Sequence, residues 1–248
     1  MSNTNMNNRH IAINSDMGEG IGLHRFGYDA ELMPLLDAAN VACGFHAGDP
    51  AIMDETVRLA VAHGVQVGAH PGLPDLVGFG RRAMAMTADE VEQIVRYQAG
   101  ALRAFLDAHD APLTHIKPHG SLYGMVARDP ELMRAVTRVA KTYGVAVYGM
   151  AGTSHEDVCA SEGVEFVPEL YVDLDYDEEG RLVILRRPIP KRPEEVSERI
   201  RHALETGRVR TTAGNEIEIP FRSICVHSDT EGCVEIVEAA RAALNAGA

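Results

Sequence analysis

The chain is poor in aromatic residues, in cysteine and in basic residues, and each shortage excludes a class of protein. Among 248 residues there is no Trp, and aromatic residues make up 5%. The four cysteines stand far apart and none forms a C-x-x-C pair, which favours buried free thiols in a reducing cytoplasm over a disulfide scaffold. The net charge of -13 repels phosphate backbones and anionic lipid, which argues against nucleic-acid and membrane-surface roles.

Long hydrophobic runs are also missing. No segment approaches the roughly 18 apolar residues that a membrane-spanning helix needs. The first ten residues, MSNTNMNNRH, are polar and Asn-rich, so residues 1–10 are predicted to be a disordered lead-in and not a signal peptide. The rest contains no low-complexity linker, and its length suits one α/β domain. We therefore expect a single cytoplasmic domain over residues 11–248.

Short β-rich runs alternate with helical segments along the chain. Seven strands are predicted at 10–16, 40–44, 65–69, 113–117, 145–150, 164–168 and 224–227. Residues 173–190 are predicted to form a loop or small hairpin, and 209–219 an appended hairpin. Strand and helix alternate seven times, which favours a parallel sheet with helices on its faces. The pattern does not decide between a closed barrel and an open sheet.

Helix boundaries are marked by capping residues. Asp49-Pro50 and Asp129-Pro130 each place an N-cap before a proline at the first helical position. Thr87 and Glu90 form a capping box that opens a long helix. Because capping explains Asp49 fully, we interpret this residue as structural although it follows a strand.

Polar and ionisable residues follow six of the seven predicted strands. The carboxyl ends of parallel strands meet at one edge, where ligands bind in barrels and in open sheets. A single His at such a place is usually structural, but four together with two carboxyl groups indicate a site. The candidates are Asp16, Glu19, His46, His70, Arg82, Lys117, His119, Glu169, Asp173, His227 and Asp229. The other histidines, His24, His63, His109, His115, His155 and His202, are interpreted as incidental.

Common nucleotide and nucleophile motifs are missing from the sequence. Gly18-Glu-Gly20-Ile-Gly22 lacks the G-x-G-x-x-G spacing, and Glu19 would place a carboxylate where a phosphate should lie. No G-x-x-x-x-G-K-[ST] or G-x-S-x-G motif occurs, so a Walker-type ATP site in this chain and a serine hydrolase are disfavoured.

Two kinds of chemistry fit the candidates. Asp16, His46 and His70 could bind a divalent metal ion that activates water and polarises a carbonyl. No H-x-x-x-H or H-x-H pair supports this, so a metal-free site stays open, with Asp16 or Glu19 as general base and histidine as acid. Lys117 and Arg82 would hold an anionic substrate or pair with nearby acids.

Six stretches resemble the LamB/YcsF family: INSDMGEGIG (13–22), ANVACGFHAGDP (39–50), VGAHPGLPDLVGFGRR (67–82), YQAGAL (97–102), HIKPHGSLY (115–123) and SICVHSDT (223–230). The resemblance extends from about residue 11 to 246. It implies a seven-stranded β/α barrel similar to those of glycoside hydrolases and polysaccharide deacetylases, which act in carbohydrate metabolism.

The resemblance also implies an activity, the ATP-dependent opening of 5-oxoproline to L-glutamate by a 5-oxoprolinase, whose A component works with subunits B and C. The site carried over by motif comprises Asp16, Glu19, His46, His70, Lys117, His119, His227 and Asp229; we add Arg82 and Glu169 as substrate-binding residues. Our own role assignments make Asp16 or Glu19 the base and let His46 and His70 polarise the carbonyl, with Lys117 stabilising charge.

One departure from the family pattern concerns the substrate. Where the family tends to have E-x-F-A-D-R, this chain has Leu174 in place of the Arg. If that Arg binds the substrate carboxylate, the chain could take another cyclic amide. Two alternatives therefore remain: a metal-dependent deacetylase or amide hydrolase that needs no ATP, and a binding protein without catalytic activity.

Overall fold

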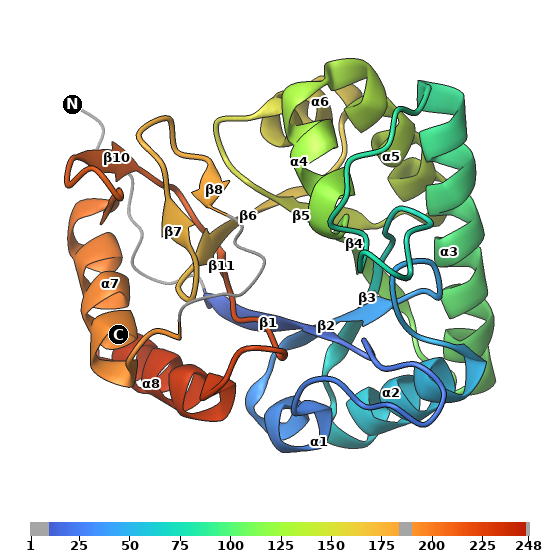
Figure 1. Ribbon diagram of the computed structural model, residues 1–248, viewed down its shortest axis with the longest axis horizontal. Coiled ribbons are helices and arrows are strands. Elements are labelled where there is room, and N and C mark those ends of the chain that lie inside the picture. The colour runs from blue at the N-terminus through green and yellow to red at the C-terminus, as the bar shows by residue number, and fades with distance from the viewer. Residues whose placement is uncertain (1–9, 184–189, 247–248) are drawn as a thin grey trace.

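Seven parallel strands close into a barrel (Figure 1). The computed structural model describes residues 10–183 and 190–246, so nearly all of the predicted lead-in lies outside the described residues. The strands are β1 (Ala12–Met17), β2 (Ala38–Ala42), β3 (Gln66–His70), β4 (Leu113–Ile116), β5 (Ala146–Gly149), β6 (Phe166–Tyr171) and β11 (Ser223–Cys225). Because β1 pairs with both β2 and β11, the barrel is closed, as the family resemblance implies.

Strand β6 differs most from its predicted bounds. It continues past Pro168 to Tyr171, so Glu169 lies inside the strand and not after it. Proline lacks an amide hydrogen, but the carbonyl of Pro168 still accepts the amide of Arg222 (2.9 Å), and the pairing with β11 continues from Glu169 to Tyr171. The prediction that the strand ends at the proline was therefore wrong.

Helices surround the barrel (Figure 1). They are α1 (Asp29–Leu32), continued by a 3-10 turn (Met33–Leu35), α2 (Pro50–His63), α3 (Ala88–Ala108), α4 (Gly120–Arg128), α5 (Pro130–Tyr143), α6 (Ser154–Glu162), α7 (Pro193–Thr206) and α8 (Cys233–Ala246). The Asp49 carboxylate accepts the amides of Ala51 and Ile52, and Thr87 and Glu90 form the predicted capping box. In the described part of the chain, no helix combines the length and the apolar character needed to cross a membrane.

Helix α4 was not predicted. Its N-cap residue, His119, makes no side-chain capping bond, and Gly120 at the first helical position has a φ of +53°. Neither residue is a standard helix-start signal, which is why the segment reads as a loop in sequence. The helix begins directly beyond β4 and so fixes His119 at the carboxyl end of the barrel.

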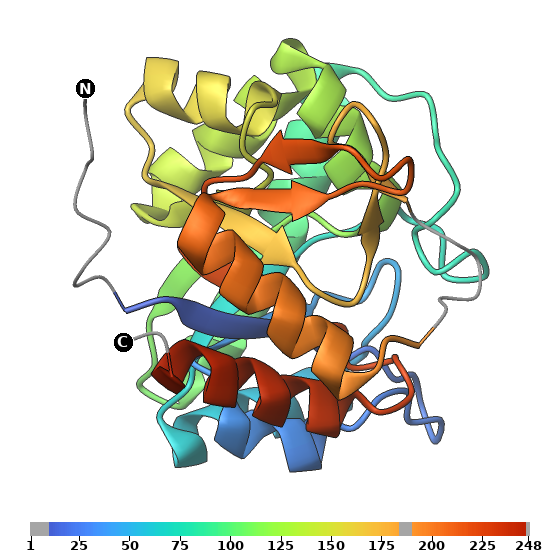
Figure 2. The ribbon, with the colours of Figure 1, turned by 90° about the vertical axis from the view of Figure 1, so that its left-hand side faces the viewer.

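Two small hairpins are added to the barrel. Strands β7 (Asp175–Tyr176) and β8 (Leu182–Val183) form the hairpin expected after β6, although part of that predicted segment, 184–189, lies outside the described residues. Strands β9 (Arg208–Arg210) and β10 (Glu216–Glu218) form the appended hairpin. This second hairpin lies beyond α7, which packs alongside α8 (Figure 2).

The barrel interior is polar, and His115 is part of it. His115 is 1% exposed, its Nε2 lies 2.7 Å from Asn40 Oδ1, and its ring stacks on Tyr148. His115, interpreted from the sequence as incidental, is thus a buried structural residue of the barrel interior. A Cβ added to Gly68 on β3 would lie 2.2 Å from the His115 ring, so only glycine leaves room for it.

Gly68→Ala should therefore destabilise the protein by about 1–3 kcal/mol through overpacking. The matched control is Gly124→Ala in α4, where an added Cβ meets only Arg128 at ordinary contact distance. This control should be neutral or stabilising by about 0.5–1 kcal/mol, because alanine is the better helix former. Urea unfolding of both variants measures the difference, and equal stabilities would contradict the packing argument.

Candidate active site

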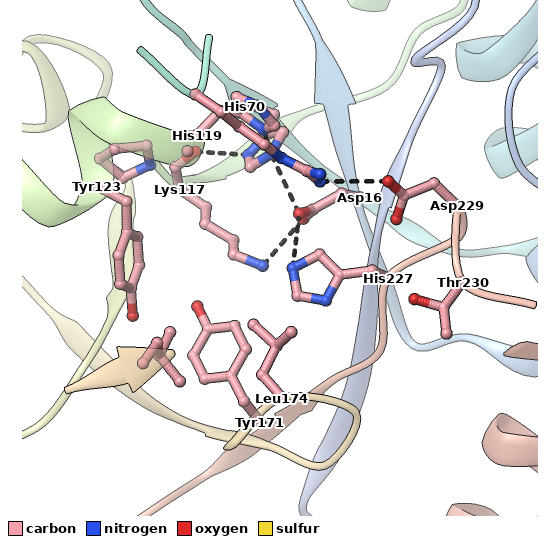
Figure 3. A pocket seen from close by; sticks show the side chains of 14 residues that line it. Asp16, His70, Lys117, His119, Tyr123, Tyr171, Leu174, His227, Asp229 and Thr230 are labelled. Carbon is pink, nitrogen blue, oxygen red and sulfur yellow. Dashed lines mark hydrogen bonds and ion pairs between the residues drawn. The ribbon is translucent and has the colours of Figure 1, made fainter. Parts of the chain in front are cut away.

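A pocket opens at the carboxyl ends of the barrel strands (Figure 3). Its volume is about 580 Å³, including space open to solvent. Loops after β1, β3, β4, β6 and β11 contribute to its wall. It is lined by Asp16, His70, Arg81, Lys117, Pro118, His119, Gly120, Tyr123, Tyr171, Leu174, Leu182, His227, Asp229 and Thr230. The expected convergence of strand-end residues is thus present for Asp16, His70, Lys117, His119, His227 and Asp229.

A buried ion pair lies at the base of this pocket. Lys117 Nζ is 2.9 Å from Asp16 Oδ1, which also accepts the side-chain amide of Asn40 at 2.8 Å. Burial alone would raise the pKa of Asp16, but the charges of His70 and Lys117 outweigh it and hold the pKa well below its usual range. Burial likewise opposes the charge on Lys117, and Asp16 together with Cys225 keeps the Lys117 pKa well above its usual range. Both groups are therefore charged at neutral pH.

His227 supplies a second cation. Its Nδ1 lies 2.9 Å from Asp173 Oδ2, which also accepts the His227 amide at 2.8 Å. Burial would lower the pKa of His227, but the adjacent Asp173 carboxylate raises it to about 9. Since Asp173 follows β6 and His227 follows β11, neighbouring strands hold this pair together.

At the pocket wall lies a cluster of three histidines and one carboxyl group, in which His70 and His119 line the pocket while Glu19 and His46 do not; each side chain is at most 4% exposed. His46 Nε2 and His119 Nδ1 each lie 3.4 Å from Glu19 Oε1. Burial and the negative charge of Asp16 raise the pKa of Glu19 well above its usual range, and burial lowers the pKa of His46 and of His119. The cluster has the donor atoms to hold a metal ion.

A second group, Asp16, Cys225 and His227, also has its donor atoms close together. The Lys117 ammonium already occupies this group, because Nζ lies 2.9 Å from Asp16 Oδ1 and 3.0 Å from Cys225 Sγ. Asp16 Oδ1 is therefore paired with lysine, and the three ligands that the sequence suggested, Asp16, His46 and His70, do not fall together in either group.

Two of the expected substrate-binding residues lie elsewhere. Glu169 is fully buried below the pocket, where it accepts Asn14 Nδ2 at 3.0 Å and the Tyr171 hydroxyl at 2.9 Å. Arg82 points away and pairs with Asp75, and its side chain is 63% exposed. Arg81 lines the pocket instead and pairs with Asp229 at 3.2 Å. The sequence could not distinguish the two arginines, because the irregular loop sets their directions.

Several pocket residues were not among the candidates. Tyr123 and Tyr171 line one wall together with Leu174 (Figure 3), and Leu182 also lines the pocket. The Tyr123 hydroxyl is buried and has no hydrogen-bond partner in the described structure. Its helical position, four residues after His119, is the only sequence signal that could have found it.

A closed parallel barrel with ionisable side chains at the carboxyl ends of its strands defines a β/α-barrel protein of the kind that carries active sites. A model of the LamB/YcsF family matches residues 11–248. The chain belongs to the LamB/YcsF family.

Named relatives match it over nearly their whole length. The lactam utilization protein lamB of Emericella nidulans is 48% identical over 230 residues, which are 91% of this chain and 90% of that protein. A 5-oxoprolinase A component of Pseudomonas aeruginosa is 43% identical over 238 residues, or 94% of each chain. The crystal structure of the lactam utilization protein from Thermus thermophilus superimposes with a TM-score of 0.88 at 40% identity and covers 96% of both chains.

The His227–Asp173 pair predicts a pH dependence of stability. A folded pKa of about 9 exceeds the unfolded value of about 6.5, so this contribution is fully present below pH 6.5 and is lost as the pH rises through 9. The loss should reach about 3 kcal/mol in the free energy of unfolding. NMR titration of the His227 ring should give the raised pKa directly, and Asp173→Asn should bring it down. A wild-type value near 6.5 would contradict the pairing.

Proposed function

We propose that this chain is the A component of a 5-oxoprolinase, which opens the lactam ring of 5-oxo-L-proline to L-glutamate with ATP and partner subunits B and C. Proteins of that name are 42–43% identical to this chain over 94% of its length, which supports the assignment. The observation that carries it is the charge arrangement of the pocket, in which Lys117 and His227 lie beside the Asp16 carboxylate and Arg81 lines the same pocket. Such a site suits a small anionic amide.

ATP solves a chemical problem of the substrate. Resonance makes a lactam carbonyl a poor electrophile, and transfer of a phosphoryl group to its oxygen removes that resonance. One water then adds to the ring carbon and the C–N bond breaks, which leaves an acyl phosphate. A second water releases phosphate and L-glutamate. This chain has no Walker-type loop, so we assign lactam binding to it and assign ATP binding to the complex with B and C.

Asp16 is the carboxylate placed to act on water. It lines the pocket and is ionised, whereas Glu19 lies behind the wall. Lys117 orients Asp16 Oδ1 and offers a positive charge to an oxyanion, while His70 Nε2 lies 3.2 Å from Asp16 Oδ2. Of the two carboxyl groups that the sequence offered as base, the pocket favours Asp16.

Leu174 bears on how the substrate carboxylate is bound. With Leu182 and the two tyrosines it forms a less polar wall, so the carboxylate cannot be bound there. Arg81, on the opposite loop and 25% exposed, reaches the pocket and is the guanidinium we assign to this task.

A reconstituted complex tests the activity. With partner subunits B and C, this chain should support ATP-dependent release of L-glutamate from 5-oxoproline, and the release should stop when the chain is omitted. The control is a complex built with the A component of a 5-oxoprolinase of known activity. If the control complex is active and the complex with this chain is not, 5-oxoproline is not the substrate of this chain.

The same assay tests a second candidate. Hydrolysis of an amide or acetyl group without ATP is favoured by one observation, the buried Glu19 and histidine cluster. Turnover that persists without nucleotide and is lost with a chelator would support that reaction instead.

Asp16→Asn should lower kcat by about 10²–10⁴-fold, because the amide cannot accept a proton from water. The matched control is Asp54→Asn on α2, where the carboxylate pairs with His109 outside the pocket. That control should keep wild-type kcat, and circular dichroism should show both variants folded. Wild-type turnover by folded Asp16→Asn would exclude Asp16 as the base.

A further inference from the structure

His70 and His119 face each other at the pocket wall, and two neutral rings cannot form a hydrogen bond between their facing nitrogens. His70 Nδ1 lies 2.8 Å from the carbonyl oxygen of Lys117, and His119 Nε2 lies 2.9 Å from that of Phe79. A carbonyl only accepts, so each of these nitrogens carries a hydrogen and donates it. If both rings are neutral, the remaining nitrogens, His70 Nε2 and His119 Nδ1, each present a lone pair at a separation of 2.9 Å, while His70 Nε2 also lies 3.2 Å from Asp16 Oδ2.

A cation between the two lone pairs resolves the conflict, and it can be a proton or a metal ion. A proton shared by the two rings would leave other atoms unsatisfied. Glu19 Oε1 is buried without a hydrogen-bond partner although His119 Nδ1 lies 3.4 Å away and His70 Nε2 4.0 Å away. One divalent cation would satisfy all three atoms at once, which a proton cannot do.

The spacing of these atoms fits a common ion. Ligands bound to one transition-metal ion at about 2.1 Å lie about 3.0–3.4 Å apart in octahedral or tetrahedral geometry. Two of the three separations, 2.9 and 3.4 Å, lie close to the ends of that range, and the third, from His70 Nε2 to Glu19 Oε1, is wider at 4.0 Å. The ligand types, two imidazoles and one carboxylate, are those of open zinc sites with three protein ligands.

His46 is excluded from this set by its orientation. Its ring stacks on that of His119 with centroids 3.7 Å apart and planes 5° apart. A lone pair lies in the plane of its ring, so one ion cannot lie in both planes. His46 Nε2 lies 3.4 Å from Glu19 Oε1, where it can support the carboxylate, and neither atom has a hydrogen-bond partner in the described structure.

We propose that Glu19, His70 and His119 form a binding site for one divalent transition-metal ion, with Zn²⁺ as the probe ion, and that His46 supports Glu19. His70 and His119 also line the pocket, so the ion would border the substrate space. The site goes beyond the proposed function and requires neither ATP nor partner subunits.

Zinc binding by the isolated, tag-free chain tests the site. After the protein is stripped with a chelator, calorimetry and elemental analysis should find one Zn²⁺ per chain. Glu19→Gln and His119→Gln should each weaken the Zn²⁺ affinity by more than about 100-fold. His46→Gln should retain one ion with an affinity lowered about 10–100-fold. His227 is a pocket histidine outside the proposed site, so the variant His227→Gln should bind Zn²⁺ with wild-type affinity.

Co²⁺ loaded in place of zinc provides a second readout that does not depend on activity. Its visible absorption should change in Glu19→Gln and His119→Gln and stay unchanged in His227→Gln. Circular dichroism of the metal-free variants separates loss of a ligand from loss of fold.

The proposal is overturned if stripped wild-type protein takes up no stoichiometric zinc, or if Glu19→Gln and His119→Gln bind zinc as wild type does. In the first case, NMR of the ring nitrogens should show a proton shared by His70 and His119. An inactive reconstituted complex that still binds one zinc would refute only the proposed function.

Discussion

The buried ammonium of Lys117 is the constraint on which the rest of the barrel interior depends. A charge that is 2% exposed is tolerated only when opposite charges and dipoles compensate its lost hydration. Those partners come from the far side of the barrel, namely Asp16 on β1 and Cys225 on β11, while Lys117 itself follows β4. The compensation exists only when the seven strands close, so the fold and the site satisfy the same electrostatic requirement.

Further polar side chains hold the Lys117–Asp16 ion pair in position. Asn40 on β2 donates to Asp16, and His115 on β4 contacts the Asn40 side-chain carbonyl oxygen. Glu169 on β6 accepts from Asn14 and Tyr171 below the pocket. These residues contact one another across the barrel, where each side chain restricts the next. The carboxylate of Asp16 is thereby held in one direction, which is what a group acting on water requires.

The pocket has a charged half and a less polar half, and the division fits a small anionic amide. Lys117, His227 and Arg81 provide positive charge, whereas Tyr123, Tyr171, Leu174 and Leu182 form the other wall. Leu174 lies on the less polar side, and Arg81 offers a guanidinium from a different loop.

Local sequence determined much of this protein. Capping residues such as Asp49 and Thr87 act through neighbouring amides, so their helices were predicted correctly. The alternation of strands and helices predicted the parallel sheet, and the motifs predicted the family and six of the pocket residues. Tertiary structure alone decided the rest. The burial of Glu169 inside β6, the choice of Arg81 over Arg82 and the tautomers of His70 and His119 all depend on contacts between residues distant in sequence. Such contacts leave no periodic signal, because they are set by where strands and loops meet in space.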